Sequence, residues 1–306
     1  MIVFSLEYAL ALIMLSAFLP GALIVVSAFR KSEFSLLEKI LAGCALGMVF
    51  QGFLPFAEGL LGINFTYTLA LANTALLYII ALGLFLYTKA YEDVLALRQD
   101  FAGFASNPLK YAIPAIILLI FALNFFVRIQ SLSPIFEELD PYYYMDIAQQ
   151  VINFGYMPFN DGTSWYPMVV QHRNVPVKAY MEATWYSLYN GGTEYNNYIL
   201  SLVANIEPPF AAAFAVFFLY LGLRAWYKKE YALIASAAAS FIPIFIFKFM
   251  AGEAEVQPYG FFGLSIFLAF FLWAQKKQDF KLMFFAGIGY MATSLGSSTE
   301  LVAAVI

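Results

Sequence analysis

Eight long apolar runs constrain what this chain can fold into more than any other feature of its sequence. A helix needs about 20 predominantly apolar residues to cross the hydrocarbon core of a bilayer. Charged residues make up only 12% of the 306 residues, whereas a soluble domain usually holds about twice that fraction. The sequence therefore predicts an all-α, polytopic membrane protein of about eight transmembrane helices. The runs lie near 5–28, 40–62, 66–88, 111–130, 208–226, 231–250, 258–275 and 282–306.

Prolines inside these runs predict local breaks in the helices. Pro20 and Gly21 follow each other in the first run, so we expect this helix to kink or to end its regular part there. Pro114 stands near the start of the fourth run, and Pro243 lies within the sixth. Membrane helices tolerate such breaks where neighbouring groups satisfy the freed backbone. The first six residues hold no Lys or Arg and the first run is longer than a signal peptide, so we interpret it as a retained span.

The basic residues gather in alternate connections between the runs, which predicts the orientation of the chain. Cytoplasmic loops of membrane proteins carry an excess of Lys and Arg. We therefore expect the basic connections on the cytoplasmic side and the N-terminus outside. Twelve of the 16 basic residues follow this alternation: Arg30, Lys31, Lys39, Lys89, Arg98, Lys110, Arg224, Lys228, Lys229, Lys276, Lys277 and Lys281. The small net charge of −4 and the lack of a basic run argue against a nucleic-acid partner.

Two parts of the chain differ in their content of polar loops. Residues 1–110 hold three predicted spans with almost no polar material on the outer side, and we interpret them as an N-terminal membrane module. Residues 111–306 hold the other spans and one long polar segment, 131–207, which the orientation places outside. The sequence stops inside an apolar run, which predicts that it is a fragment of a longer protein. Because Cys44 is the single cysteine, an internal disulfide is excluded.

The outer segment is rich in acidic and aromatic residues. Tyr and Trp favour the boundary between membrane and water, so we expect short helices that lie against the outer leaflet. The first of them should cover 140–154, with Asp140 as its N-cap and Pro141 as its first helical residue. The aromatic residues include Trp165, Trp185, Tyr142, Tyr143, Tyr144, Tyr156, Tyr166, Tyr180, Tyr186 and Tyr189.

Two acidic motifs are expected on the outer face at similar depth. One follows the fourth span directly, and the other forms the turn between the sixth and seventh spans. Carboxylate and amide oxygens suit a hard divalent cation such as Mg²⁺ or Mn²⁺. The alternative is structural, since Asp140 can serve as a helix cap and the second motif as a solvated turn. The motifs read Glu137-Glu138-Leu139-Asp140 and Glu253-Ala254-Glu255-Val256-Gln257.

A few basic residues on the predicted outer side are candidates for binding phosphate. Arg173, Lys178 and Lys248 supply cationic groups, and the single histidine, His172, precedes Arg173. Cationic side chains, Arg especially, suit the geometry of phosphate oxygens. For Lys248 the alternative is a side chain that extends from a helix end toward water, and for His172 it is an ordinary surface position.

The order and spacing of these motifs resemble a known family. Glu138-Leu139-Asp140-Pro141-Tyr142-Tyr143 after a span is similar to the first acidic motif of the catalytic subunit of archaeal oligosaccharyltransferase, a GT-C membrane glycosyltransferase. Trp165-Tyr166-Pro167 matches a Tyr-Pro pair later in that loop. The family's series of proline, basic residue, glycine and acid-x-acid also keeps its spacing here. Its members are Pro243, Lys248, Gly252, Glu255 and Gln257.

The resemblance covers residues 111–306 and departs from the family at three points. Gln257 stands where the family usually has Asp, Glu or His, which puts the metal site in doubt. The first three spans have no counterpart in the core family pattern. The later external loop with its catalytic Glu motif and the C-terminal soluble domain are absent from the sequence.

The resemblance implies an inverting glycosyltransferase with a GT-C-like fold and a large first external loop. Its donor would be a polyprenyl-phosphate- or polyprenyl-diphosphate-linked sugar or oligosaccharide in the outer leaflet, and its acceptor protein or lipid. Asp140, Glu255 and Gln257 would hold Mn²⁺ or Mg²⁺, and Asp140 or Glu138 would orient the acceptor. Arg173, Lys248 and His172 would bind the donor phosphate. Further loop candidates are Glu253, Tyr142, Tyr143, Trp165 and Tyr166.

Two other functions stay open at this point. A related GT-C enzyme would move one sugar from a lipid monophosphate onto lipid, glycan or protein. A membrane transporter or lipid-binding scaffold would have no catalytic role. Ion-coupled transport usually needs ionisable groups within the spans, and the predicted spans hold few, which favours an enzyme.

Overall fold

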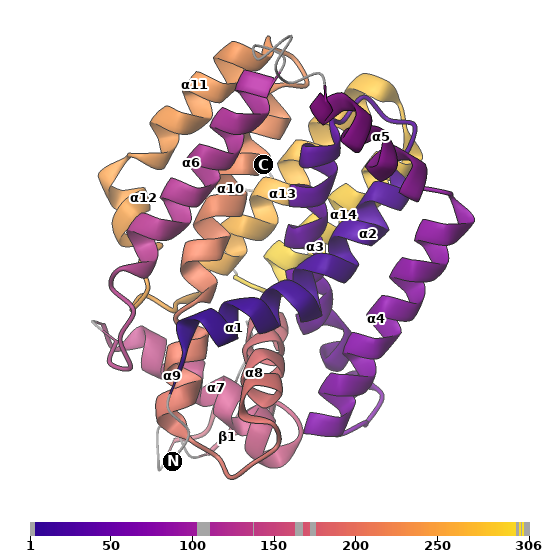
Figure 1. Cartoon of the computed structure of the whole chain (residues 1–306). Coiled ribbons are helices and arrows are strands. Elements are labelled where there is room, and N and C mark those ends of the chain that lie inside the picture. The colour runs from indigo at the N-terminus through magenta and orange to yellow at the C-terminus, as the bar shows by residue number, and fades with distance from the viewer. Residues whose placement is uncertain are drawn as a thin grey trace.

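The computed structural model describes residues 4–102, 111–136, 138–162, 168–171 and 176–297, together with residues 300 and 302. Nearly all regular structure is helical (Figure 1). The N-terminal part holds α1 (Leu6–Ile13), the π-helical segment η1 (Met14–Phe18), α2 (Leu19–Ala28), α3 (Leu36–Leu60), α4 (Tyr67–Tyr87) and α5 (Tyr91–Ala102). The rest holds α6 (Ala112–Ile129), α7 (Asp140–Phe154), β1 (Asn160–Asp161), β2 (Val170–Gln171), α8 (Pro176–Asn190), α9 (Asn197–Ala204), α10 (Glu207–Leu223), α11 (Lys229–Ser240), α12 (Pro243–Phe247), α13 (Val256–Lys277) and α14 (Phe280–Ser294).

Six helical stretches among the described residues are long and apolar enough to cross a membrane. By the length and the apolar composition of these helices, the chain is a multi-pass membrane protein. Two of them join consecutive elements, α1 through α2 and α9 through α10. The six are Leu6–Ala28, Leu36–Leu60, Tyr67–Tyr87, Ala112–Ile129, Asn197–Leu223 and Val256–Lys277.

The sixth and eighth predicted spans differ from the helices in the structure. The run 231–250 is divided into α11 and α12, because Pro243 starts a new helix after an extended residue at Ile242. The last run begins with α14, which has 15 residues, too few to cross about 30 Å of hydrocarbon at 1.5 Å per residue. The count of eight transmembrane helices therefore stays a prediction.

The first helix is irregular directly before Pro20, but it does not end there. The helix continues from Leu6 to Ala28, and the irregularity lies before the proline, in η1. A proline removes one i→i−4 hydrogen bond and crowds the preceding turn. Widening that turn into a π-helical segment relieves the crowding while the helix continues.

The first helices approach each other closely through small residues. A Cβ added at Gly47 of α3 would lie 2.0 Å from the carbonyl oxygen of Ala17, and one at Gly43 would lie 2.5 Å from the carbonyl oxygen of Gly21. Small residues let helix backbones touch where lipid supplies no hydrophobic driving force. Gly43 and Gly47 thus form a small-xxx-small contact that holds α3 against α2.

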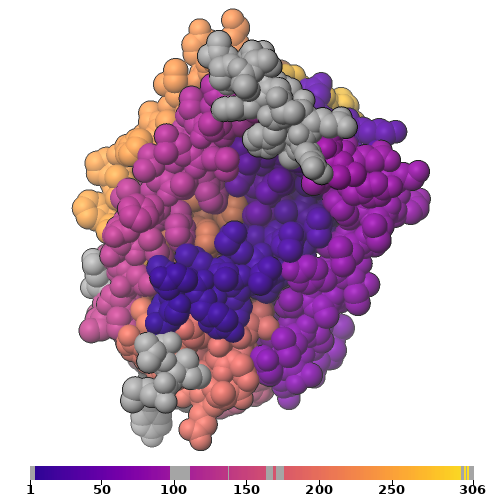
Figure 2. All heavy atoms as spheres, viewed as in Figure 1, coloured from indigo at the N-terminus to yellow at the C-terminus, as the bar shows by residue number. Residues whose placement is uncertain are grey.

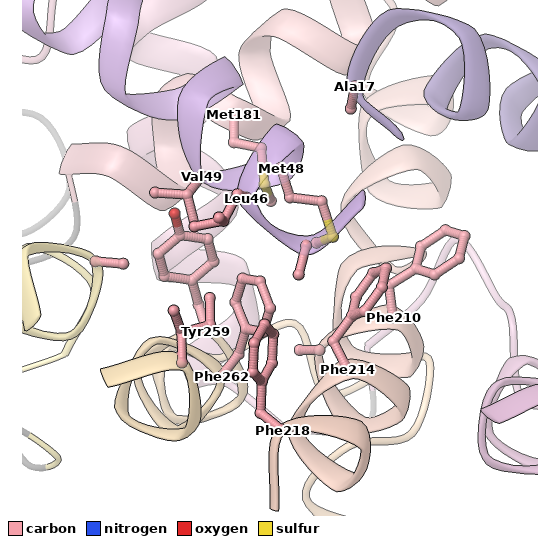
Figure 3. Close-up of a cluster of buried hydrophobic side chains, with 14 of the residues drawn as sticks. Ala17, Leu46, Met48, Val49, Met181, Phe210, Phe214, Phe218, Tyr259 and Phe262 are labelled. Carbon is pink, nitrogen blue, oxygen red and sulfur yellow. The ribbon is translucent and has the colours of Figure 1, made fainter. Parts of the chain in front are cut away.

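The N-terminal three-span part and the rest of the chain share one hydrophobic core. Figure 3 shows Leu46 and Met48 of α3 beside Met181 of α8 and the aromatic rings of α10 and α13. Ala17 from η1 lies at the edge of the same cluster. In the space-filling view, α1 lies across one face of the molecule between α4 and α6 (Figure 2). The segment 131–207, to which α8 belongs, is therefore anchored on the N-terminal helices.

The polar elements are separated toward the two ends of the bundle. Helices α7, α8 and α9 and strand β1 lie at one end, and α5 lies at the other (Figure 1). β1 pairs with β2 as a two-stranded antiparallel sheet. Ion pairs join the predicted cytoplasmic loops at the α5 end: Arg30 with Glu92, Arg224 with Glu38 and Lys277 with Glu33.

Candidate functional site

The two acidic motifs meet in space, although more than a hundred residues separate them in sequence. Glu138 lies in the connection between α6 and α7, and Glu253 and Glu255 lie in the turn between α12 and α13. One carboxylate oxygen from each of the three lies within 4.8 Å of the others. We call Glu138, Glu253 and Glu255 the acidic cluster. It is the one group of at least three metal-ligand side chains found among the described residues.

The acidic cluster runs from solvent into the protein. The side chain of Glu138 is 52% exposed, that of Glu253 10% and that of Glu255 2%. Three carboxylates at such short range repel one another in a partly buried site, and a cation or a shared proton offsets this repulsion. Hard oxygen ligands in this arrangement fit Mg²⁺ or Mn²⁺ better than a softer metal.

Lys248 supplies a cationic group to the cluster within the protein itself. Its Nζ lies 3.2 Å from Oε2 of Glu138, 3.3 Å from Oε1 of Glu255 and 3.8 Å from Oε2 of Glu253. Lys248 is the C-cap of α12, so the short helix that begins at Pro243 delivers the ammonium group to the carboxylates. The sequence placed Lys248 near phosphate, and it did not predict this contact.

The environments of Glu138 and Glu255 move their pKa values in opposite directions. Burial, together with a hydrogen bond to Glu138, raises the pKa of Glu255 above its ordinary value. Hydrogen bonds to Glu255 and Lys248 lower the pKa of Glu138. The inner carboxyl therefore keeps its proton more readily and shares it with the outer carboxylate.

The turn that carries Glu253 and Glu255 is fixed by contacts from several elements. Gly252 has a φ of +106°, which favours glycine, and its N–H donates to Oδ1 of Asn205 at 2.9 Å. Nζ of the buried Lys178 in α8 donates to the carbonyl oxygen of Ala254 at 3.1 Å. Helix α8 and the end of α9 thus set the position of both acids.

Asp140 lies beside the acidic cluster without belonging to it. Burial, followed by the negative charges of neighbours that include Asp140 and Glu255, raises the pKa of Tyr144 to about 12. Asp140 and Glu255 thus both act on the Tyr144 hydroxyl. Asp140 is the first residue of α7, whose N-cap is Leu139 without a side-chain hydrogen bond. The predicted capping role of Asp140 is therefore wrong, and its exposed carboxylate is not engaged as a cap.

Gln257, the third predicted ligand, is the second residue of α13. Within the part of the chain that the structure describes, its Oε1 is buried and has no hydrogen-bond partner. A buried amide oxygen without a partner is costly. A cation or a water molecule would satisfy this oxygen, so Gln257 stays a predicted ligand.

The remaining candidates have different surroundings. The hydroxyl of Tyr142 accepts the N–H of Phe136 at 3.2 Å, which closes the loop before α7. The ring of Tyr143 packs edge-on against Tyr144. Four candidates lie outside the described residues: His172, Arg173, Trp165 and Tyr166.

Several aromatic residues of the segment 131–207 are buried within the protein. Tyr180, Trp185, Tyr186 and Tyr189 in α8 are at most 7% exposed, and Nε1 of Trp185 donates to Oε1 of Gln51 in α3. These four side chains therefore pack against the bundle instead of forming the expected aromatic belt. The sequence could not distinguish aromatic residues at the membrane–water boundary from buried ones. Amphipathic rings suit both that boundary and a core with polar partners.

No protein-family model matches the chain, and no curated protein matches it. The geometry of the acidic cluster and the motifs that form it are therefore the features that point to a function.

Proposed function

We propose that the chain is a membrane glycosyltransferase that acts at the outer face of the membrane. Its donor is a sugar or oligosaccharide on a polyprenyl phosphate or diphosphate, and its acceptor is a protein. One observation carries this proposal: Glu138, Glu253 and Glu255 from two distant segments bring their oxygens within 4.8 Å of one another. Two of the six candidate spans, Ala112–Ile129 and Val256–Lys277, adjoin these segments, so a lipid-borne phosphate could reach the cluster from the bilayer.

The proposed reaction is a displacement at the anomeric carbon of the donor sugar. The acceptor nucleophile forms a bond to this carbon as the bond to the phosphate oxygen breaks, and the configuration inverts. The bonding electrons pass to the phosphate, and the acceptor proton passes to the carboxylate of Asp140 or Glu138. A divalent cation, when bound, would neutralise the negative charge of the phosphate leaving group.

The residues of the chain have separate tasks in this proposal. Glu138, Glu253 and Glu255 provide the carboxylate ligands, and Gln257 adds a neutral oxygen. Asp140 lies at the exposed start of α7, where it can orient an acceptor amide or hydroxyl. Lys248, with Arg173 and His172 from the loop, binds phosphate oxygens. Tyr144 is held in its neutral form by its raised pKa, so it can donate a hydrogen bond.

The proposal is tested with the full chain in lipid vesicles and a polyprenyl-diphosphate-linked saccharide as donor. We expect Mn²⁺-dependent release of the polyprenyl diphosphate, with a loss of about a hundredfold in Asp140→Ala and in Glu255→Gln, as is usual when a charge-stabilising group is removed. Glu194→Gln changes an exposed acid outside the cluster and should keep the wild-type rate. Transfer that stays intact in Asp140→Ala would refute the role of this carboxylate.

A second candidate function has one observation in its favour. Glu207 lies within a candidate span, is 0% exposed and, among the described residues, has no hydrogen-bond partner at either carboxylate oxygen. The next two residues are Pro208 and Pro209, which lack the N–H groups that often receive an acid at a helix start. Intramembrane carboxylates often serve ion or proton transport.

The same vesicles distinguish the two functions. If the chain is a glycosyltransferase, Glu207→Gln should retain transfer activity within about twofold, because the carboxylate is not in the acidic cluster. Under the transport hypothesis, ion-dependent solute uptake would be present in the wild type and lost in Glu207→Gln. Uptake without any glycosyl transfer would favour the transporter.

A further inference from the structure

The position of Lys248 within the acidic cluster has a consequence for metal binding. Its Nζ lies 3.2–3.8 Å from oxygens of all three carboxylates, so the ammonium group lies among them. Divalent Mg²⁺ and ions of similar size bind carboxylate oxygens at about 2.1 Å. An ion bound to the same three oxygens would need the space that the ammonium group occupies. The two cations would also repel each other at this distance.

The side chain of Lys248 has a route out of the cluster. It is 36% exposed, and its outermost partner, Glu138, is 52% exposed. A lysine carries its charge on a flexible four-carbon stem and does not depend on a fixed planar geometry as arginine does. It can therefore rotate toward solvent from the edge of the site while α12 stays in place.

We propose that Lys248 is an internal counter-ion that a divalent cation displaces, and that the displaced ammonium group then binds the phosphate of the lipid donor. This inference rests on the proposed function, since it assumes that the acidic cluster receives a metal ion. The released ammonium group stays within one side-chain length of the cluster, where a phosphate that contacts the metal would offer it a new anionic partner. Metal and phosphate binding are then coupled through one side chain.

Two opposite effects of one substitution follow from this coupling. Lys248→Met removes the competitor, so the metal should bind more tightly. The same change removes a phosphate partner, so a phosphate ligand should bind less tightly in the presence of metal. Because thermodynamic coupling is reciprocal, Mn²⁺ should raise phosphate affinity by a larger factor in the wild type than in Lys248→Met. If Lys248 had a purely structural role, Lys248→Met would weaken the binding of both the metal and the phosphate ligand.

The experiment uses the full chain in nanodiscs of neutral lipid, with Mn²⁺ alone and then with farnesyl phosphate as the phosphate probe. Free Mn²⁺ is measured by electron paramagnetic resonance and corrected for Mn²⁺ that farnesyl phosphate binds without protein. We expect Lys248→Met to bind Mn²⁺ about tenfold more tightly and farnesyl phosphate with Mn²⁺ at least fivefold more weakly. Lys248→Arg, which keeps the charge and adds a planar group that binds carboxylates well, should bind Mn²⁺ no more tightly than the wild type.

Lys281→Met is the matched control, because it removes one exposed lysine at the start of α14 and should leave both affinities unchanged. The thermal midpoint of each variant shows whether it is folded. Should Lys248→Met misfold, Lys248→Gln serves in its place. Unchanged or weaker Mn²⁺ binding in the folded Lys248 variant would overturn the inference. If neither the wild type nor any variant binds Mn²⁺, the metal site of the proposed function fails, which is a different result.

Discussion

At the scale of single residues, Glu255 shows how the fold prepares an acid for metal binding. It is the N-cap of α13 without a side-chain cap hydrogen bond, so its carboxyl is directed to the acidic cluster instead of its own helix. Burial and the hydrogen bond with Glu138 raise its pKa, while the pKa of Glu138 is lowered. The inner carboxyl of Glu255 therefore keeps its proton to a higher pH than the outer carboxyl of Glu138 does.

These opposite pKa shifts predict a pH dependence of metal binding. A metal ion needs deprotonated ligands and so competes with the proton on Glu255. Because the pKa of Glu255 lies above its ordinary value of 4.5, Mn²⁺ affinity should continue to rise with pH above 4.5, until this carboxyl has lost its proton. Calorimetry in buffers of different ionisation enthalpy should show proton release on binding. In Glu255→Gln this rise should disappear, and a pH profile identical to the wild type would contradict the assignment.

The sequence predicted the meeting of the two acidic motifs better than it predicted their roles. Topology alone required both motifs to lie on one face, because each adjoins the outer end of a predicted span. Which side chains converge depends on the backbone of the two turns, which has no periodicity to read. For this reason the sequence favoured Asp140 as a ligand, whereas the structure places Glu138 and Glu253 in the cluster with Glu255.

At the scale of elements, two prolines in apolar runs have different effects. Pro20 lies in a helix that continues through a π-helical segment, whereas Pro243 starts a separate helix. The first helix is supported on both sides of Pro20 by its contact with α3. Hydropathy could predict both runs, but it could not predict which proline would end a helix, because that depends on the packing of neighbours.

The close contact of α3 with η1 and α2 predicts different responses to alanine at two glycines. Gly47→Ala puts a Cβ 2.0 Å from the Ala17 carbonyl oxygen, so the helices must separate, at a cost of about 1–3 kcal/mol. Gly83→Ala in α4 meets nothing within 4 Å and should be neutral or stabilising by up to about 1 kcal/mol. Thermal unfolding in detergent compares the two. If the thermal midpoint of Gly47→Ala were equal to or above that of Gly83→Ala, the close packing at Gly47 would be contradicted.

At the scale of the whole molecule, the two ends of the bundle differ in chemistry. Arg30, Arg224 and Lys277 form ion pairs at the α5 end, and the acidic cluster lies near the other end, beside α7. The sequence predicted this separation from the alternation of basic loops. It did not predict that residues 1–110 would join the main core, because the long-range contacts of an apolar helix leave no pattern in its sequence.

The orientation of the bundle is tested by cysteine labelling. In a Cys44→Ser background, Glu194→Cys on the outer connection should react with a membrane-impermeant maleimide on intact cells. Lys229→Cys, in a predicted cytoplasmic loop, should react only after the membrane is opened. Both positions are exposed, so access to the reagent depends on the side of the membrane. Labelling of Lys229→Cys alone on intact cells would reverse the orientation and move the acidic cluster to the cytoplasmic face.

The central claim is that Glu138, Glu253 and Glu255 hold a divalent cation. The most direct test is anomalous diffraction from crystals of the full chain soaked in Mn²⁺. We expect a manganese peak about 2.1 Å from oxygens of the three carboxylates, with Nζ of Lys248 turned out of the cluster. A structure at saturating Mn²⁺ in which Lys248 keeps its place and manganese lies elsewhere, or is absent, would contradict the claim.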